Sequence, residues 1–322
     1  MARARRSGEF ELIARYFAPL AKGFKGARGL KSDNAYLAGD AHHDLAVKTD
    51  TIVSGVHFLA DEKPELVAAR ALRVCLSDLA AGGATPFAYQ LSLSLAKNWK
   101  ESWVAGFARG LAADQRRYRI LLSGGDTTHT PGPTTITVTA FGKVARGTGL
   151  GRDGAHAGDE LWVSGTIGDA ALGLLVAKGR LKGRALEKRY RLPQPRTKLG
   201  PRLIGIATAT ADVSDGLLAD AGHIAEASRL SVTIERDRVP LSAGARRAVT
   251  SDGSLWANVL GGGDDYEILI ALPQRKVPAL LAAGRLAGVS LTCIGTFSRG
   301  QGVRLTVGGR ETRAPRKGYV HF

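Results

Sequence analysis

The sequence predicts a two-domain protein of mixed α and β structure, best described as an α+β (α/β mixed) fold. The chain has 322 residues, which is enough for two domains that each bury a core. Hydrophobic residues make up 44% of the chain and charged residues 23%, a balance typical of globular proteins. Strand-like and helix-like apolar segments alternate along its whole length, and this alternation predicts mixed layers of helix and sheet.

Composition limits the classes of function. The formal charge of +16 comes mostly from scattered arginines, without the aromatic interleaving or zinc-finger spacing of nucleic-acid readers, so no specific nucleic acid is expected. No run of about 18 apolar residues predicts a membrane span, and the basic N-terminus lacks the apolar stretch of a secretory signal. Cys75 and Cys293 lie far apart in apolar contexts, as expected of reduced thiols in a cytoplasmic protein.

The first half begins with a predicted amphipathic helix at residues 8–22 and a basic loop at 22–32 whose spacing does not match a phosphate-binding P-loop. Strands and helices then alternate. The predicted strands are 44–53, 87–96, an apolar strand from 120, and 134–145; the predicted helices are 64–81 and 99–117.

The helix at 64–81 carries an acid on its apolar face. Pro64 suits the first turn, and Ala71 and Cys75 belong to a stripe at helical spacing that also includes Asp78. A carboxylate that faces the interior needs a partner. A structural hydrogen bond and a functional site are both open readings of Asp78.

The boundary between the domains is placed at residues 148/149, so that the domains are 1–148 and 149–322. Gly149, Gly151 and Gly154 match the dinucleotide fingerprint, but a strand follows at 159–164 where that motif demands a helix, so a Rossmann fold is rejected. The second half continues with mixed elements. The predicted helices are 168–179, 197–208, 216–229, 241–250 and 275–286, and the further strands are a short one ending near 212, 231–235, one after residue 266, 290–297 and 302–306.

Several acids stand at the ends of elements beside Ser, Thr or Gly. Each has a structural alternative: Gly125 with Asp126 suits a tight turn, and Ser214 or Asp215 suits a helix N-cap. Taken together, five of these acids share the pattern. They are Asp33, Asp50, Asp78, Asp126 and Asp212. Carboxylates and hydroxyls without a Cys/His cluster are the ligands that magnesium prefers, and in a basic protein they favour nucleoside triphosphate chemistry.

Six motifs follow one another along the chain: GEFELI (8–13), KTDTIVSGVHF (48–58), LSDLAAGGA (76–84), GGDT (124–127), DVSDGL (212–217) and GGDDY (262–266). Together and in this order they resemble the thiamine-monophosphate kinase family, which belongs to the aminoimidazole-ribonucleotide synthetase-like superfamily. The resemblance covers the chain from residue 8 to its end. It implies an N-terminal α/β domain whose sheet pairs with a second subunit in a homodimer, a C-terminal α+β domain, and ATP held between them.

The resemblance also implies roles for individual residues. The expected ligands of several Mg²⁺ ions are Asp33, Asn34, Thr49, Asp50, Asp78, Asp126, Asp212 and Asp215, with Asp50, Asp78 and Asp126 as the catalytic acids. The expected ATP contacts are Gly125, Asp126, Arg152 and Ser214. The expected contacts of thiamine monophosphate are His57, Asp264 and Tyr319. For His57 taken alone, an ordinary surface histidine is the alternative.

Three positions depart from the family pattern. Asn34 stands where the family usually has a metal-binding Asp, and it brings an amide oxygen without charge. Lys48 stands where a hydroxyl residue is common. Asp264 stands where the family has Glu and is one methylene shorter, so that either a bridging water or Asp265 would have to complete the contact.

The implied reaction is ATP- and Mg²⁺-dependent phosphorylation of thiamine monophosphate to thiamine diphosphate by direct in-line transfer. A phosphate monoester is largely dianionic at neutral pH, so no general base is needed to create the nucleophile. Two alternatives stay open at this stage. One is another superfamily enzyme that activates an amide or acyl oxygen with ATP, and the other is a non-catalytic nucleotide-binding homologue.

Overall fold

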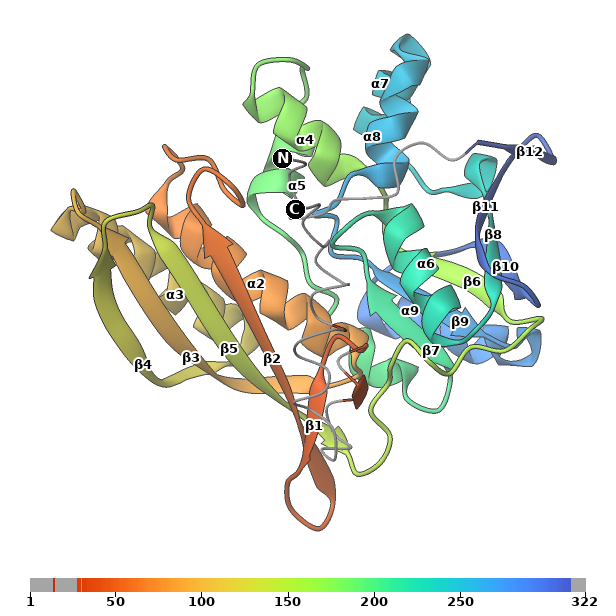
Figure 1. The fold of residues 1–322 in the computed structure, drawn as a ribbon, viewed down its shortest axis with the longest axis horizontal. Helices are drawn as coiled ribbons and strands as arrows, with labels where there is room; N and C mark the ends of the chain where they lie inside the picture. Colours follow the sequence, from red (N-terminus) through yellow and green to blue (C-terminus); the bar gives the residue numbers. More distant parts are fainter. Residues whose placement is uncertain (1–13, 15–27, 30, 314–322) are drawn as a thin grey trace, which may run out of the picture.

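Two β-sheets, each with its own buried core, make up most of the molecule (Figure 1). The structure is a computed structural model that describes residues 14, 28–29 and 31–313. The helix expected at residues 8–22 and the expected substrate contact Tyr319 lie outside this described part. Within the described residues, no helix is both long enough and apolar enough to cross a membrane.

The first sheet has five strands in the order β1-β2-β5-β3-β4. They are β1 (Ala35–Ala38), β2 (His43–Val53), β3 (Thr85–Ala96), β4 (Leu121–Thr130) and β5 (Thr135–Ala145). β3 and β4 pair in parallel, and the other pairs are antiparallel. Helices α2 (Pro64–Ala81) and α3 (Glu101–Tyr118) cover one face of this sheet, here called the inner face.

The two faces of the first sheet differ in chemistry because strand side chains alternate. Ala46 and Ile52 of β2 are buried on the inner face. Thr49 and Thr51 of the same strand point to the opposite, outer face, where they bond the hydroxyls of Thr139 and Thr137 at 2.9 and 2.8 Å. The outer face thus presents these threonine hydroxyls and is exposed, because no element among the described residues covers it.

The second sheet has seven strands in the order β12-β11-β8-β10-β6-β9-β7. The strands are β6 (Glu160–Ser164), β7 (Ala209–Asp212), β8 (Ser231–Glu235), β9 (Ile268–Leu272), β10 (Leu291–Ser298), β11 (Gly302–Val307) and β12 (Arg310–Thr312). The helices are α4 (Asp169–Ala177), α5 (Arg184–Arg191), α6 (Leu217–Ala227), α7 (Ala243–Ser251), α8 (Trp256–Gly261) and α9 (Val277–Ala287). Helix α9 packs on one face, and α4, α6, α7 and α8 contribute to the core on the other.

Helix α2 joins the two halves. Every residue from Val67 to Ala81 is buried, because α2 packs on the first sheet and also contacts β7 and β9 of the second (Figure 1). At its C-terminal end the backbone oxygen of Ala81 accepts a 2.6 Å hydrogen bond from the hydroxyl of Thr210 on β7. The residues at the end of α2 are therefore held against the second sheet.

Most predicted elements are present, and the strand after the Gly149–Gly154 motif confirms that the motif is not a dinucleotide fingerprint. The helix predicted at 197–208 is wrong: only a 3-10 turn forms there, Gly200–Leu203. Pro201 has no N–H for helical continuation, and Gly200 approaches α2 so closely that a Cβ on it would lie 2.1 Å from the Ala80 oxygen. Conversely, α5 forms inside the predicted connection at 180–196.

The tight turn considered for Gly125 and Asp126 is also wrong. Both residues lie inside β4, which continues to Thr130 in parallel register with β3. Gly125 faces Leu91 of that strand, and a Cβ on it would meet the Leu91 oxygen at 1.8 Å. The glycine thus permits close pairing of β3 and β4 rather than a chain reversal.

Candidate active site between the two sheets

Carboxylates from four separate segments come together where α2 meets both sheets. Asp33, Asp78 and Asp212 each offer a ligand oxygen, and these oxygens lie within 4.8 Å of one another. Lys48 links Asp50 to these three acids, because its ammonium Nζ lies 3.2 Å from Asp50 Oδ1 and 3.0 Å from Asp78 Oδ1. These four aspartates are called the acid cluster below.

Local structure explains why each acid points to the same place. Lys48 and Asp50 alternate with outward-facing Thr49 on β2, so both side chains lie on the inner face toward α2. Asp78 lies on the buried stripe of α2, as the helical spacing predicts. Asp212 ends β7, the edge strand of the second sheet that contacts α2.

Burial sets the electrostatics of the acid cluster. It raises the pKa of Asp78 well above its usual value, although the charge of Lys48 opposes this rise. Burial and the neighbouring charge of Asp33 raise the pKa of Asp212 to about 7. Burial alone would lower the pKa of Lys48, but Asp50 and Asp78 raise it well above its usual value. The guanidinium of Arg152 pairs with Asp33. Cationic partners therefore compensate part of the buried negative charge.

Four buried side-chain oxygens in this region have no hydrogen-bond partner among the described residues. They are Asn34 Oδ1, Ser77 Oγ, Asp212 Oδ2 and Asp220 Oδ1. The amide of Asn34 is oriented by a 2.7 Å hydrogen bond from its Nδ2 to the backbone oxygen of Asp78. A buried oxygen without a donor is costly, and a hard cation satisfies such oxygens. The donor set thus fits Mg²⁺, which the resemblance implies.

A second group of possible ligands lies beside the acid cluster at the start of α6. Ligand atoms of Asp215, Asp220 and His223 lie within 4.8 Å of one another. The predicted N-cap role of Ser214 or Asp215 is wrong, because Gly216 occupies that position. Asp220 Oδ2 instead accepts the backbone N–H groups of residues 214, 215 and 216 at 3.0–3.1 Å. Ser214 donates to Asp212 at 3.4 Å, so its hydroxyl adjoins the acid cluster.

His57 and Asp264 lie on loops from different halves of the molecule. His57 Nδ1 accepts the backbone N–H of Val53 at 3.0 Å, so the neutral ring carries its proton on Nε2 as a donor. Asp264 pairs with the buried Arg70 of α2 at 3.0 Å and accepts the hydroxyl of Tyr266 at 2.8 Å. Asp264 and Tyr266 both have positive φ, +71° and +52°, a strained arrangement that often marks functional loops.

Asp265 has a structural role. It is buried, and its carboxylate accepts the N–H groups of Gly168 and Ala170 at 2.6 and 3.1 Å at the start of α4. Burial raises the pKa of Asp265 to about 7. Since both oxygens are engaged by α4, Asp265 does not replace Asp264 as an outward-facing acid.

Thr49, Gly125 and Asp126 lie away from the acid cluster within the same chain. Thr49 points to the outer face. Gly125 and Asp126 line an exposed hollow of about 290 Å³ on β4 and its neighbours. Asp50 and Asp126 are separated by three strand intervals, about 14 Å at the usual spacing. One ion cannot bind both residues of a single chain.

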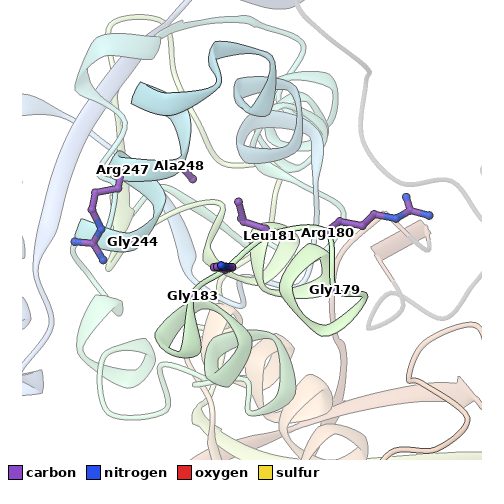
Figure 2. Close-up of a pocket in the computed structure, with 8 residues that line it drawn as sticks. Gly179, Arg180, Leu181, Gly183, Gly244, Arg247 and Ala248 are labelled. Carbon is purple, nitrogen blue, oxygen red and sulfur yellow. The ribbon is translucent and has the colours of Figure 1, made fainter.

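The second domain also has a basic pocket of about 480 Å³ between the α4–α5 connection and α7 (Figure 2). Its lining includes Arg180, Lys182 and Arg247. Figure 2 shows that the guanidinium groups of Arg180 and Arg247 extend to opposite sides of the pocket. The pocket contains no carboxylate and is therefore distinct from the acid cluster.

The two sheets, with an acid cluster between them, correspond to a known class of protein. The family model described as AIR synthase related protein, N-terminal domain, matches residues 31–144, and the corresponding C-terminal domain matches residues 156–308. The molecule is a two-domain AIR synthase related protein with two mixed sheets.

Full-length relatives narrow this class. The chain is 41% identical to the thiamine-monophosphate kinase of Caulobacter vibrioides over 97% of this chain and 90% of that protein. It resembles the crystal structure of the Stenotrophomonas maltophilia K279a enzyme at 38% identity and a TM-score of 0.77, over 94% and 98% of the two chains. It also resembles AaThiL complexed with AMPPCP and TMP, at 30% identity and a TM-score of 0.84, over 100% of both chains. The chain belongs to the thiamine-monophosphate kinase family.

Sequence reasoning missed the partners that orient the predicted residues. Arg70 holds Asp264 from α2, and His223 lies near Asp215 with 3.9 Å between Nε2 and Oδ2. For His223 there was a signal, because Asp220 and His223 are three residues apart on one helix and face the same side. No sequence signal pointed to Arg70, because its partner Asp264 is distant in the sequence.

Replacing Asn34 with Asp tests the amide at the edge of the acid cluster. The carboxylate cannot donate to the Asp78 oxygen, so the Mg²⁺-free variant should lose about 1–3 kcal/mol of unfolding free energy. Mg²⁺ should raise its melting temperature more than that of the parent, because the new charge binds the ion. Thermal melts with and without Mg²⁺ measure both effects. The exposed Asn98→Asp is the control, and an identical Mg²⁺ response of the Asn34 variant and the parent would contradict the assignment.

The buried carboxyl of Asp265 predicts a pH effect on stability. Its pKa is about 7 in the folded chain against an ordinary 3.8. Its stabilising contribution is therefore complete below about pH 4 and is lost as the pH rises through about 7. Between about pH 5 and about pH 8, Asp265→Asn should show a smaller fall in melting temperature than the parent. The exposed Asp252→Asn should keep the parental slope, because its pKa is lowered; a parental slope in the Asp265 variant would refute the prediction.

Proposed function

We propose that this chain transfers the γ-phosphoryl group of ATP to the phosphate of thiamine monophosphate and releases thiamine diphosphate and ADP. The observation that carries this proposal is the convergence of Asp33, Asp50, Asp78 and Asp212 in a chain whose full-length relatives are thiamine-monophosphate kinases. The complex of AaThiL with AMPPCP and TMP, similar over its full length, supports the same pair of substrates.

The acid cluster is the proposed magnesium site. Asp33, Asp78 and Asp212 would hold an ion with Asn34 Oδ1 as a neutral ligand, and Asp215 would extend the site toward α6. Bound Mg²⁺ would supply positive charge to the phosphates and reduce repulsion between two polyanions. The protein's own contribution is to hold Asp78, Asp50 and Asp212 on three rigid elements, α2, β2 and β7, before the substrates arrive.

The residues of the site favour direct transfer. The acceptor phosphate is already an adequate nucleophile at neutral pH, so no base has to remove a proton.

His57, with Nε2–H as a donor, suits a phosphate oxygen of the acceptor. Asp264, held by Arg70 and Tyr266, suits the positively charged thiamine ring system. Phe58 and Tyr266 belong to one buried apolar cluster, which keeps the two loops together. Tyr319 stays a proposed contact outside the described residues.

The proposed ATP contacts divide into two groups. Arg152 and Ser214 adjoin the acid cluster in the same chain. Gly125 and Asp126, with the metal ligand Thr49, face outward from the first sheet. The proposed domains are 1–148 and 149–322. A homodimer formed by the N-terminal domains would cover this outer face and bring the second group to the partner's site. Exposed Phe87, Leu121 and Leu122 on β3 and β4 support such contact.

The decisive assay is formation of thiamine diphosphate from thiamine monophosphate, ATP and Mg²⁺. Asp78→Asn should reduce kcat by about 100-fold or more, because it removes charge at the centre of the acid cluster. The control is Glu101→Gln, an exposed acid at the start of α3. No product from the parent chain would refute the function. A phosphorylated enzyme on the turnover pathway would refute direct transfer.

Subunit complementation tests the role of Asp126. Asp78→Asn and Asp126→Asn chains should each be inactive, but a mixture should recover activity if Asp126 serves the partner's site. In a randomly exchanged equal mixture, about one quarter of the sites would be intact, since half of the dimers are mixed and each has one unaltered site. No recovery, with subunit exchange verified by differently tagged chains, would contradict the shared site.

A further inference from the structure

Lys48 is the side chain at the centre of the acid cluster that the proposed reaction does not use. It lies on the inner face of β2, with 21% of its side chain exposed. Its Nζ lies 3.2 Å from Oδ1 of Asp50 and 3.0 Å from Oδ1 of Asp78, so that it forms an ion pair with each. The ammonium thus bridges two acids from different elements, as a bound cation would.

The charges show what this bridge leaves for metal ions. The acid cluster contributes four carboxylates, and within residues 31–313 the cations paired with it are Lys48 and Arg152. With all four acids ionised, two negative charges remain, which one divalent ion neutralises. Without Lys48 three would remain, and a single divalent ion would leave one uncompensated in a buried site.

The ammonium of Lys48 already pairs with the two oxygens that an ion bridging Asp50 and Asp78 would use. Mg²⁺ lies about 2.0–2.1 Å from its ligand oxygens. An ion bound by both Asp50 Oδ1 and Asp78 Oδ1 would compete with the ammonium of Lys48, which lies 3.2 and 3.0 Å from the same two oxygens. Asp33, Asp78 and Asp212 still offer ligand oxygens within 4.8 Å of one another, and Asp212 Oδ2 has no hydrogen-bond partner among the described residues.

We propose that Lys48 is a resident cation of the active site that takes the place of one divalent ion between Asp50 and Asp78. The acid cluster then binds one divalent ion fewer than it would with an uncharged residue at position 48. This inference rests on the proposed magnesium site, and it makes Lys48 a positioning residue: it holds two carboxylates at a fixed separation without touching the reacting atoms.

Counting bound Mn²⁺ in the full-length chain tests the proposal without an activity measurement. Free Mn²⁺ is measured by electron paramagnetic resonance in titrations of the parent, Lys48→Met and Lys48→Arg. Lys48→Met should bind one more ion per chain than the parent, and Lys48→Arg, which keeps the charge, should bind the parental number. The matched control is Lys143→Met on β5, an exposed lysine on the same sheet. An unchanged count in folded Lys48→Met would overturn the proposal.

A measurement on the parent chain decides the question if Lys48→Met does not fold. Amine labelling is followed at Lys48 and at the exposed Lys143 by mass spectrometry, with and without saturating Mg²⁺. If Lys48 is a resident cation, its labelling should stay far below that of Lys143 in both conditions. A rise toward the level of Lys143 when Mg²⁺ is added would mean that the ion displaces the ammonium, and the proposal would be wrong.

Failure of this inference is distinguishable from failure of the proposed function. If the parent chain forms no thiamine diphosphate but Lys48→Met gains an Mn²⁺ site, the function is wrong and the role of Lys48 stands. If the parent is active and the ion count is unchanged by Lys48→Met, only the role of Lys48 is wrong.

Discussion

The repulsion among four clustered carboxylates, of which Asp78 and Asp212 are buried, is the constraint on which the site depends. Asp33, Asp50, Asp78 and Asp212 come from four segments, and their like charges would drive these segments apart without compensation. Lys48 and Arg152 supply part of the compensation within the chain. The remaining negative charge is what the proposed divalent ion would neutralise, and through that ion the site would bind polyphosphate.

Helix α2 makes this arrangement possible because it belongs to the cores of both halves. Its burial against the first sheet and against β7 fixes Asp78 beside acids from each. Arg70, two turns earlier on the same helix, holds Asp264 of the second half. One rigid element thus sets the distance between the proposed metal region and the proposed contact of the acceptor, which is what in-line phosphoryl transfer requires.

The outer face of the first sheet places a second requirement on the protein. Hydroxyls from β2 and β5 and the carboxylate of Asp126 lie there, separated from the acid cluster by the sheet itself. A single chain therefore presents two separate sets of polar side chains. The proposed dimer would unite them, and it would also cover the exposed Leu121 and Leu122 on the edge strand β4.

The sequence by itself determined the alternation of elements, the inward direction of Asp78 and the family, since local periodicity and ordered motifs carry that information. It did not predict that residues 197–208 fail to form a helix, because the close approach of Gly200 to α2 is a tertiary contact. Strand alternation alone puts the neighbours Thr49 and Asp50 on opposite sides of the sheet, but only the tertiary structure decided which side α2 covers and therefore which of the two joins the acid cluster. The bridge that Lys48 makes to both Asp50 and Asp78 was likewise decided by folding, because its second partner lies on another element.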